Sequence, residues 1–265
     1  MKHLLLIISL FVGLNYFAQE VKKIDPATKY FYKDATLETD DYKIYIVDVI
    51  AVGKQLKFKI KIFNKTNDYL FIKPNEISYV TAAKTVFSKD ENYVVPPNEE
   101  EREVIDFRGT EMQVDNFTLD IKGIYKASAG GQIIRMPNFN LPPTKNEFTI
   151  GNFTCTLKKT ESKTDKAYAK FECQYAGDYI GIINPNKCIA IMPNGTDNPN
   201  VKKQRALILE KNKSDDFLAV FLEVKDAGDL KKNSIAINWN ETFRESKLIK
   251  LPSSKLEMVK ESEKK

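Results

Sequence analysis

The chain has 265 residues, a formal net charge of +5 and a single histidine, His3. Residues 20–150 hold 19 lysines and arginines against 20 acidic residues, whereas residues 151–265 hold 21 against 16. Neither half carries the concentrated basic face that nucleic-acid binding needs, so we expect no nucleic-acid partner.

The first residues, MKHLLLIISLFVGLNYFAQE, are organised like a signal peptide over residues 1–18. Lys2 is a positive start, and residues 4–14 form an apolar run that is short for a membrane span. Ala18 is the expected cleavage position, but Tyr16 departs from the small-x-small rule, so an uncleaved anchor is the alternative. No later stretch is apolar and long enough to span a membrane. We expect a periplasmic or secreted protein, and not a lipoprotein, because the first cysteine is Cys155.

The rest of the chain alternates apolar and polar residues with period two, which predicts β-strands. Turn chemistry such as NKTND, VPPNEEE and SAGG separates the alternating runs. We expect an all-β fold without a long helix. The strand candidates in the first part of the chain are residues 42–52, 55–63, 68–80, 102–107, 116–125 and 132–141.

The run KQLKFKIKIFNK shows the alternation most clearly. Leu56, Phe58, Ile60 and Ile62 take one parity, and Lys57, Lys59 and Lys61 take the other. We expect the lysines to lie on the solvated face of a strand, opposite acidic residues of neighbouring strands. The cross-strand candidates are Asp41, Asp48, Glu101 and Glu103. Binding of a polyanion by the lysine row is the alternative.

The order of motifs recurs along the chain. DYLFIKPNE at residue 68 resembles DYIGIINPNK at 178, and LPPTKNEFTI at 141 resembles LPSSKLEMVK at 251, both at an offset of 110. DNFTLDI at 115 resembles DDFLAVF at 215. These matches predict an internal duplication, with one β-sandwich over 36–148, a second over 149–260 and a disordered tail over 261–265.

In these features the chain resembles exported bacterial proteins built from tandem immunoglobulin-like sandwiches. The resemblance rests on the strand–NKTNDY–strand corner, the VPPNEEE turn and the duplication. It implies a fold and an extracytoplasmic location, and it implies no active site.

The three cysteines fall in the second half. Cys155 alternates with Phe153 and Leu157, and Cys173 alternates with Phe171 and Tyr175, so both should point into the core. We expect at most one disulfide, between Cys155 and Cys173, because consecutive strands often pair. Cys188 takes the position that Ile77 holds in the first half.

Several residue clusters suggest chemistry, and each has a simpler structural interpretation. Glu99, Glu100, Glu101 and Glu103 could serve a glycosidase, but adjacent glutamates in a turn should stay solvated. The turn around Asp197 could bind calcium but offers one acidic ligand. Trp239 alternates with Ile235 and Ile237, so it should be a core residue and not a sugar platform. The triplet Tyr30–Phe31–Tyr32 should cover a sandwich edge, with an exposed anchor as the alternative.

The sequence lacks the residues and motifs of most common catalytic mechanisms. Without a histidine beyond His3, triads based on imidazole are excluded, and no serine-hydrolase or phosphate-loop motif is present. We therefore expect no enzyme, no cofactor and no metal site. The expected function is protein–protein interaction with another envelope or cell-surface protein, or a structural role. A carbohydrate-binding module or adhesin that recognises a glycan is the alternative, and a carboxylate hydrolase is a third. The expected contact residues lie in two loops, at Pro96, Glu99, Glu100 and Glu101, and at Pro193, Asn194 and Asp197.

Overall fold

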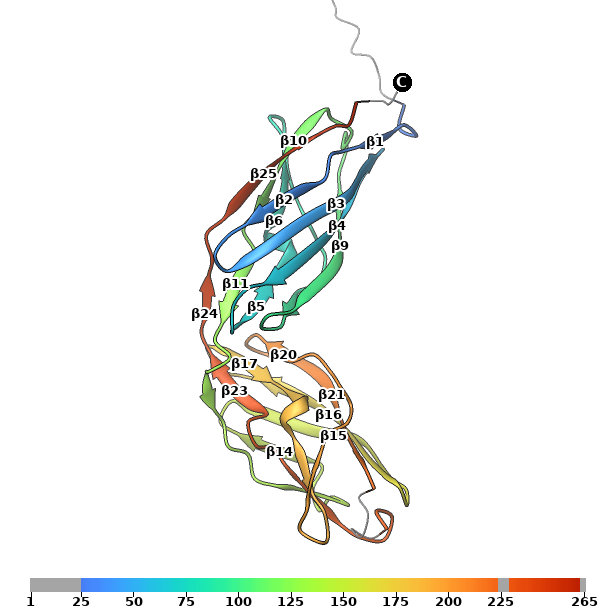
Figure 1. Ribbon diagram of the computed structural model, residues 1–265, viewed down its shortest axis with the longest axis vertical. Coiled ribbons are helices and arrows are strands. Elements are labelled where there is room, and N and C mark those ends of the chain that lie inside the picture. The colour runs from blue at the N-terminus through green and yellow to red at the C-terminus, as the bar shows by residue number, and fades with distance from the viewer. Residues whose placement is uncertain (1–24, 224–228, 263–265) are drawn as a thin grey trace, which may run out of the picture.

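The computed structural model describes residues 25–223 and 229–262, and these residues form two stacked lobes (Figure 1). Residues 29–127 and 248–259 make the upper lobe, and residues 132–246 make the lower lobe. The expected signal peptide lies outside the described residues. The described part of the chain is built from antiparallel strands, with two 3₁₀ turns and no α-helix, so the all-β prediction is confirmed.

Each lobe has two layers, like a β-sandwich. The front sheet of the upper lobe has the order β1-β3-β4-β9, with β2 paired to β3. Its strands are β1 (Lys29–Phe31), β2 (Ala35–Glu38), β3 (Tyr42–Val52), β4 (Gln55–Asn64) and β9 (Glu100–Arg108).

The back layer of the upper lobe consists of two short sheets, ordered β25-β10-β6-β7 and β24-β11-β5-β8. Its strands are β5 (Tyr69–Ile72), β6 (Ile77–Val80), β7 (Thr85–Phe87), β8 (Tyr93–Val95), β10 (Asn116–Ile121), β11 (Ile124–Ala127), β24 (Leu248–Lys250) and β25 (Ser254–Val259). The 3₁₀ turn η2 (Pro74–Glu76) separates β5 from β6, because a proline cannot donate to the ladder of an interior strand.

The lower lobe repeats this plan. Its front sheet has the order β14-β15-β16-β21, and its back layer has the orders β13-β22-β18-β19 and β12-β23-β17-β20. The front strands are β14 (Glu147–Ile150), β15 (Phe153–Ser162), β16 (Lys166–Tyr175) and β21 (Lys213–Leu222). The back elements are β12 (Gln132–Ile133), β13 (Phe139–Leu141), β17 (Ile180–Ile183), η3 (Pro185–Lys187), β18 (Ile189–Ile191), β19 (Asp197–Pro199), β20 (Leu207–Leu209), β22 (Ile235–Asn238) and β23 (Phe243–Ser246).

Two separate apolar cores lie between the layers. The upper core joins inward residues of β3, β4 and β9 to those of the back layer, and Leu56, Phe58, Ile60 and Ile62 are all buried in it. The lower core is built around Trp239, which is 1% exposed and packs among phenylalanines. Burial of such side chains contributes about 1.5–3 kcal/mol each, so each lobe has its own source of stability.

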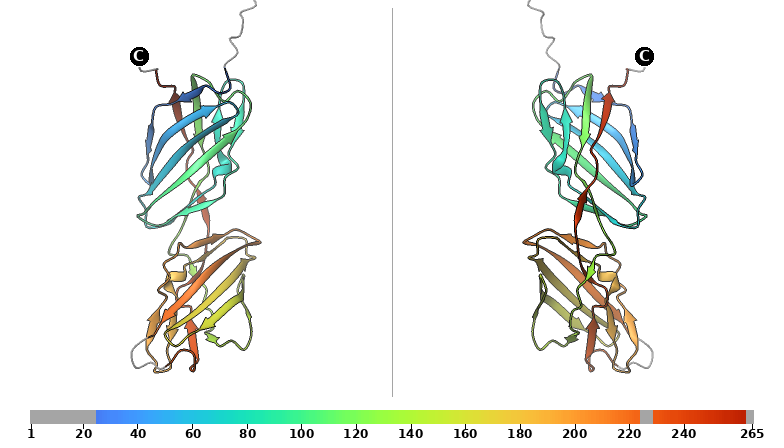
Figure 2. Two further views of the ribbon diagram at one scale, coloured as in Figure 1. Left: turned by 90° about the vertical axis from the view of Figure 1, so that its right-hand side faces the viewer. Right: turned by 90° about the vertical axis from the view of Figure 1, so that its left-hand side faces the viewer.

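The strand pairings divide the chain differently from the expected ranges 36–148 and 149–260. β12 and β13, which fall inside the first range, pair with β23 and β22 of the lower lobe. β24 and β25, which fall inside the second, pair with β11 and β10 of the upper lobe. The lower lobe is therefore inserted in the chain between β11 and β24 of the upper lobe (Figure 2).

The chain crosses between the lobes twice, as an antiparallel ribbon. Ala127 lies opposite Leu248 on the upper side, and Gln132 lies opposite Glu245 on the lower side. A Cβ atom on Gly131 would lie 2.3 Å from the Glu245 carbonyl oxygen, so the close approach at this crossing needs a glycine. Two crossings restrain the lobes more than one linker would.

The sequence repeats match the structure unevenly. The pair at 68 and 178 is structurally equivalent: both segments form a strand, a Pro-Asn 3₁₀ turn and a second strand, and Ile77 and Cys188 both follow the turn. The pair at 141 and 251 diverges, because β14 joins a front sheet and β25 a back sheet. The pair at 115 and 215 falls on β10 and β21, which hold different places in their lobes.

Candidate functional site

The seam between the lobes brings charged side chains of both lobes together, and one of them, Glu101, is buried. A small apolar cluster forms its centre, from Tyr69 and Ala127 above and from Ile180, Ile182 and Ala206 below. Asn184 donates from Nδ2 to the Tyr69 hydroxyl at 3.3 Å, and burial raises the pKa of that hydroxyl. The cluster aligns the polar groups around it.

Two ion-pair groups tie the lobes together beside this cluster. Lys73 of the upper lobe pairs with Glu210 of the lower lobe, and Asn92 donates to the same carboxylate at 3.2 Å. Arg205 of the lower lobe pairs with Glu101 and lies 3.9 Å from a carboxylate oxygen of Glu103. Both arrangements join residues more than 100 positions apart, so they form only when the lobes are seated against each other.

Glu101 and Glu103 occupy the inward parity of β9. They lie opposite Ile62 and Ile60 of β4, and they continue the row of Ile105 and Phe107 towards the seam. The Glu101 side chain is only 9% exposed. Burial raises the pKa of its carboxyl, and nearby Glu103 and Glu99 add to the rise, against the attraction of Arg205.

Tyr93 stands beside these carboxylates. Its ring packs against the upper core, and its hydroxyl oxygen is buried with no hydrogen-bond partner among the described residues. Burial raises the pKa of this phenol, and the charges of Glu103, Glu101 and Asp90 raise it further. A buried hydroxyl without a partner costs about 1–3 kcal/mol.

Two cavities open at the seam and share Asn92, Tyr93 and Arg205. One, of about 310 Å³, reaches Glu210, Lys213 and Asp215, and the other, of about 370 Å³, reaches Asp90, Glu91 and Glu103. Together their walls carry five carboxylates and two cationic side chains, so the seam is acidic. A cationic group is the ligand that such walls favour.

The first predicted contact loop leads into this seam. Glu99 is exposed, and Glu100 pairs with Lys61 at 2.6 Å and with Arg102 at 2.9 Å. The carbonyl of Pro96 accepts hydrogen bonds from Glu99 and Asn64, which fixes the turn. Glu101, expected to be solvated, is instead buried against Arg205, because it shares the parity of the core residues of β9.

The second predicted contact loop belongs to the lower lobe, in the back sheet that contains β19. Pro193, Asn194 and Asp197 are exposed. The Asn194 side chain accepts bonds from Thr196 around the positive-φ Gly195 (φ +84°). The two predicted loops lie in different lobes, and no metal-binding group of three or more His, Cys, Asp or Glu occurs in the described part of the chain.

The lysine row lies on the solvated face of β4, as predicted. Lys59 pairs with Asp48 at 2.8 Å and Lys61 with Glu100, while Lys57 lies opposite Asp106 in the register. Of the expected acidic partners, only Asp48 pairs with the row; Asp41 pairs with Lys126 and the two inward glutamates with Arg205. The row is therefore charge-balanced by its own sheet.

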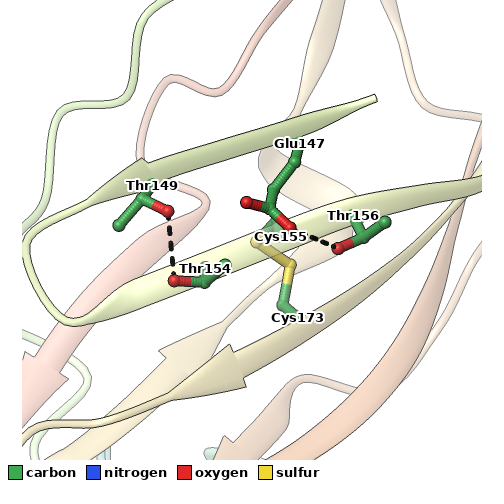
Figure 3. The surroundings of a disulfide bond; sticks show 6 residues. All are labelled: Glu147, Thr149, Thr154, Cys155, Thr156 and Cys173. Atoms are coloured by element: carbon green, nitrogen blue, oxygen red, sulfur yellow. Dashed lines mark hydrogen bonds between the residues drawn. A yellow bond between two sulfur atoms is a disulfide. The ribbon is translucent and has the colours of Figure 1, made fainter. Parts of the chain in front are cut away.

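The predicted disulfide is confirmed. Cys155 and Cys173 lie directly opposite each other on β15 and β16 and are bonded, with both side chains buried (Figure 3). Cys188 is a buried free thiol, and burial raises its pKa to about 12, so it stays protonated at neutral pH.

The aromatic candidates divide between core and surface. Trp239 is a core residue, as predicted. Tyr32 is also buried and donates to the Val114 carbonyl at 2.7 Å, whereas Phe31 is 48% exposed on the edge strand β1. The triplet thus covers an edge of the front sheet and leaves one ring in solvent.

In the described residues, no helix is long and apolar enough to cross a membrane. No protein-family model and no curated protein matches the chain. Among solved structures, one described as Phpd with cadmium complexed with hydroethylphosphonate aligns at 8% identity over 89% of this chain and 80% of its own. Its TM-score of 0.13 is too low to carry an argument about fold or function.

Proposed function

We propose that the protein works outside the cytoplasm without catalytic turnover, by binding another envelope or cell-surface protein or as a structural component. The observation that carries the proposal is the seam, where ion pairs and a two-strand ribbon join two lobes into one elongated body. Such a body presents loops and strand edges at fixed positions, which are surfaces for protein recognition. The buried disulfide supports export, because disulfides persist in oxidising compartments.

The proposed architecture is a pair of immunoglobulin-like sandwiches that arose by duplication. The matching β5–η2–β6 and β17–η3–β18 segments support it, as does the shared order of the front sheets. In the back layers, β12 and β13 of the lower lobe hold the places that β24 and β25 hold in the upper lobe. An exchange of these strands between neighbouring repeats would explain why the segments at 141 and 251 are similar in sequence but differ in structure.

Carbohydrate binding is the alternative, and exposed aromatic rings are what it needs. Phe31, Phe87 and Tyr179 are the most exposed rings, at 48%, 55% and 51%. Phe31 lies in β1, Phe87 lies in β7, and Tyr179 lies in the loop before β17. The three rings therefore do not form a line on which a sugar chain could stack. This distribution favours protein recognition over sugar recognition.

Proximity crosslinking in the native cell, followed by identification of the captured protein, tests the proposal. We expect one abundant extracytoplasmic partner, and shortening the exposed tip of either loop, at 98–99 or 193–196, should weaken its capture without unfolding the protein. Hydrolysis of glycans by the purified protein that is lost in Glu101→Gln or Glu103→Gln would contradict the proposal and favour a carboxylate hydrolase.

A further inference from the structure

β9 is the last strand of the upper front sheet, and part of its outer edge is open. Asn64 donates to Glu99 and Gly109 donates to Lys54, so the odd-numbered residues of β9 bond to β4. The even-numbered residues direct their N–H and C=O groups away from the sheet. Asp90 accepts from the N–H of Asp106 at 2.9 Å, which closes one end of the edge.

Arg102 and Val104 are left on the open part of this edge. Within the described residues, their outward main-chain groups have no hydrogen-bond partner. Val104 is 52% exposed, and the Arg102 side chain is 70% exposed. Unpaired groups of this kind are a template for an added strand.

The corresponding edge of the lower lobe is closed. β21 holds the place of β9 in its sheet, and the segment before it covers its outward groups. Asn200 accepts from the N–H of Val220 at 3.0 Å, and Gln204 accepts from the N–H of Leu218 at 2.8 Å. Val201 in turn donates to the Val220 carbonyl. The two lobes thus differ at the edge that would recruit another chain.

Cavities flank the open edge on both sides. The acidic seam cavity lies on the inner side, and a groove of about 620 Å³ lies on the outer side, with both reaching Glu103 and Val104. The outer groove is lined by Tyr45, Val47 and Val104 among charged side chains of both signs. An added strand would direct one set of alternate side chains into the inner cavity and the other set beside Val104 at the rim of the outer groove.

The inner hollow has the chemistry to receive a cation. Asp90, Glu91 and Glu103 line it against one positive side chain, Arg205. Asn92 and Tyr93 line the same wall. A lysine or arginine side chain would meet several acceptors there.

We propose that the open edge of β9 accepts an extended segment of a partner protein as an added antiparallel or parallel strand. Basic side chains of the segment point into the acidic seam cavity, and apolar ones lie beside Val104 at the rim of the outer groove. The inference rests on the proposed protein-binding function and names the surface that performs it.

Binding of short labelled peptides to the purified full chain tests this surface. The probe is acetyl-TVKVKVT-amide, and the controls are TVEVEVT and the non-alternating TKKVVVT. We expect the alternating basic peptide to bind at least about tenfold more tightly than either control, because only it combines strand alternation with inward positive charge. Hydrogen exchange should slow at the amides of Arg102 and Val104 when it binds.

Two proline variants separate strand addition from charge attraction. Val104→Pro removes one outward N–H and leaves the β4 ladder intact, and Thr36→Pro does the same at β2 on the opposite edge of the sheet. We expect Val104→Pro to abolish binding, Thr36→Pro to leave it unchanged, and Glu103→Gln to weaken it about tenfold. Circular dichroism and thermal melts establish that each variant is folded.

Equal binding by Val104→Pro and the natural chain, equal binding of the scrambled peptide, or no saturable binding of any peptide would overturn the assignment. A dimer of the natural chain that Val104→Pro dissociates would show that a second copy occupies the edge, which also overturns it. Partner capture that survives in Val104→Pro and is lost on shortening 193–196 would leave the proposed function standing and reject this surface.

Discussion

At the residue scale, several buried hydroxyl groups have no hydrogen-bond partner among the described residues, and each lowers the stability of the fold. Tyr79 is fully buried against Phe117 and Phe107, with ring centroids 4.8 and 6.4 Å away. Its hydroxyl has no hydrogen-bond partner in the part of the chain that the structure describes. Burial raises its pKa from 10 to about 12.

The Tyr79→Phe variant should show the cost directly. Removing the hydroxyl should leave stability at pH 7 unchanged or raise it by about 1 kcal/mol. Because the folded pKa lies above the unfolded one, ionisation of Tyr79 leaves the free energy of unfolding unchanged below pH 10 and lowers it as pH rises from 10 towards 12. The natural chain should therefore lose about 1 kcal/mol more than Tyr79→Phe between pH 9 and 11. Urea unfolding at both pH values measures the difference, and identical pH dependence would contradict the account.

The lysine row, Lys57, Lys59 and Lys61, should contribute little to the free energy of unfolding. Replacing Lys57, Lys59 and Lys61 together by glutamine should change the free energy of unfolding by no more than about 0.5 kcal/mol per site, because exposed ion pairs contribute little. Partner binding should persist. A loss of binding with steep salt dependence would instead show that the row recognises an anion.

At the element scale, the β15–β16 hairpin is cross-linked by the disulfide between Cys155 and Cys173. Its disulfide closes a loop between residues 18 positions apart, directly across two strands that pair along their length. The pairing was predictable because both cysteines fall on the inward parity of consecutive strands. In the structure Cys188 directly follows the 3₁₀ turn η3 of the back layer and is a free thiol.

Replacing Cys155 and Cys173 together by alanine should lower the free energy of unfolding by about 2–4 kcal/mol, since the unfolded chain loses a cross-link. Trp239, the only tryptophan, lies in the same lobe and reports its unfolding by fluorescence. Reduction of the natural chain should lower stability by a similar amount, whereas Cys188→Ala should leave the effect of reduction unchanged. Insensitivity of the Trp239 transition to reduction would contradict a structural disulfide.

Local patterns predicted many elements and missed two kinds of feature. β4 follows its expected run because one face is buried and the period of two is unbroken. β3 also matches its expected bounds, although a β-bulge between Val47 and Ile50 shifts its buried positions by one residue. The inward position of Glu101 and Glu103 was missed because charge was taken as a sign of exposure. Counting back from Phe107 and Ile105 at spacing two would have found them. The exchange of β24 and β12 was missed because pairs such as Ala127 with Leu248 are too distant for local periodicity to show.

At the scale of the whole molecule, the contact of Arg205 with Glu101 and Glu103, here called the arginine clamp, helps to join the two lobes. Arg205 brings a positive charge to a buried carboxylate that has two other glutamates nearby. The apolar seam cluster and the ribbon hold this arrangement in register.

Arg205→Ala should destabilise the joined molecule by about 1–2 kcal/mol at pH 7.5, because Glu101 is left buried without its partner and Arg205 itself is half exposed. The folded-state pKa of Glu101 is already raised, so its burial is tolerated best when it is protonated. The defect should therefore shrink near pH 4.5 and grow as pH rises through the folded pKa. Adding Glu101→Gln should restore most of the stability at pH 7.5. A defect that is independent of pH would contradict the clamp.

The central claim is that the protein recognises a partner protein outside the cytoplasm, and crosslinking inside the native cell tests it most directly. A photoreactive amino acid is placed at Val104 on the open edge, and a matched one at Thr36 on the opposite edge of the same sheet. The account predicts one discrete protein adduct of extracytoplasmic origin from position 104 and none from position 36. Equal or absent adducts at both positions, together with no capture through the 96–101 and 193–200 loops, would contradict it.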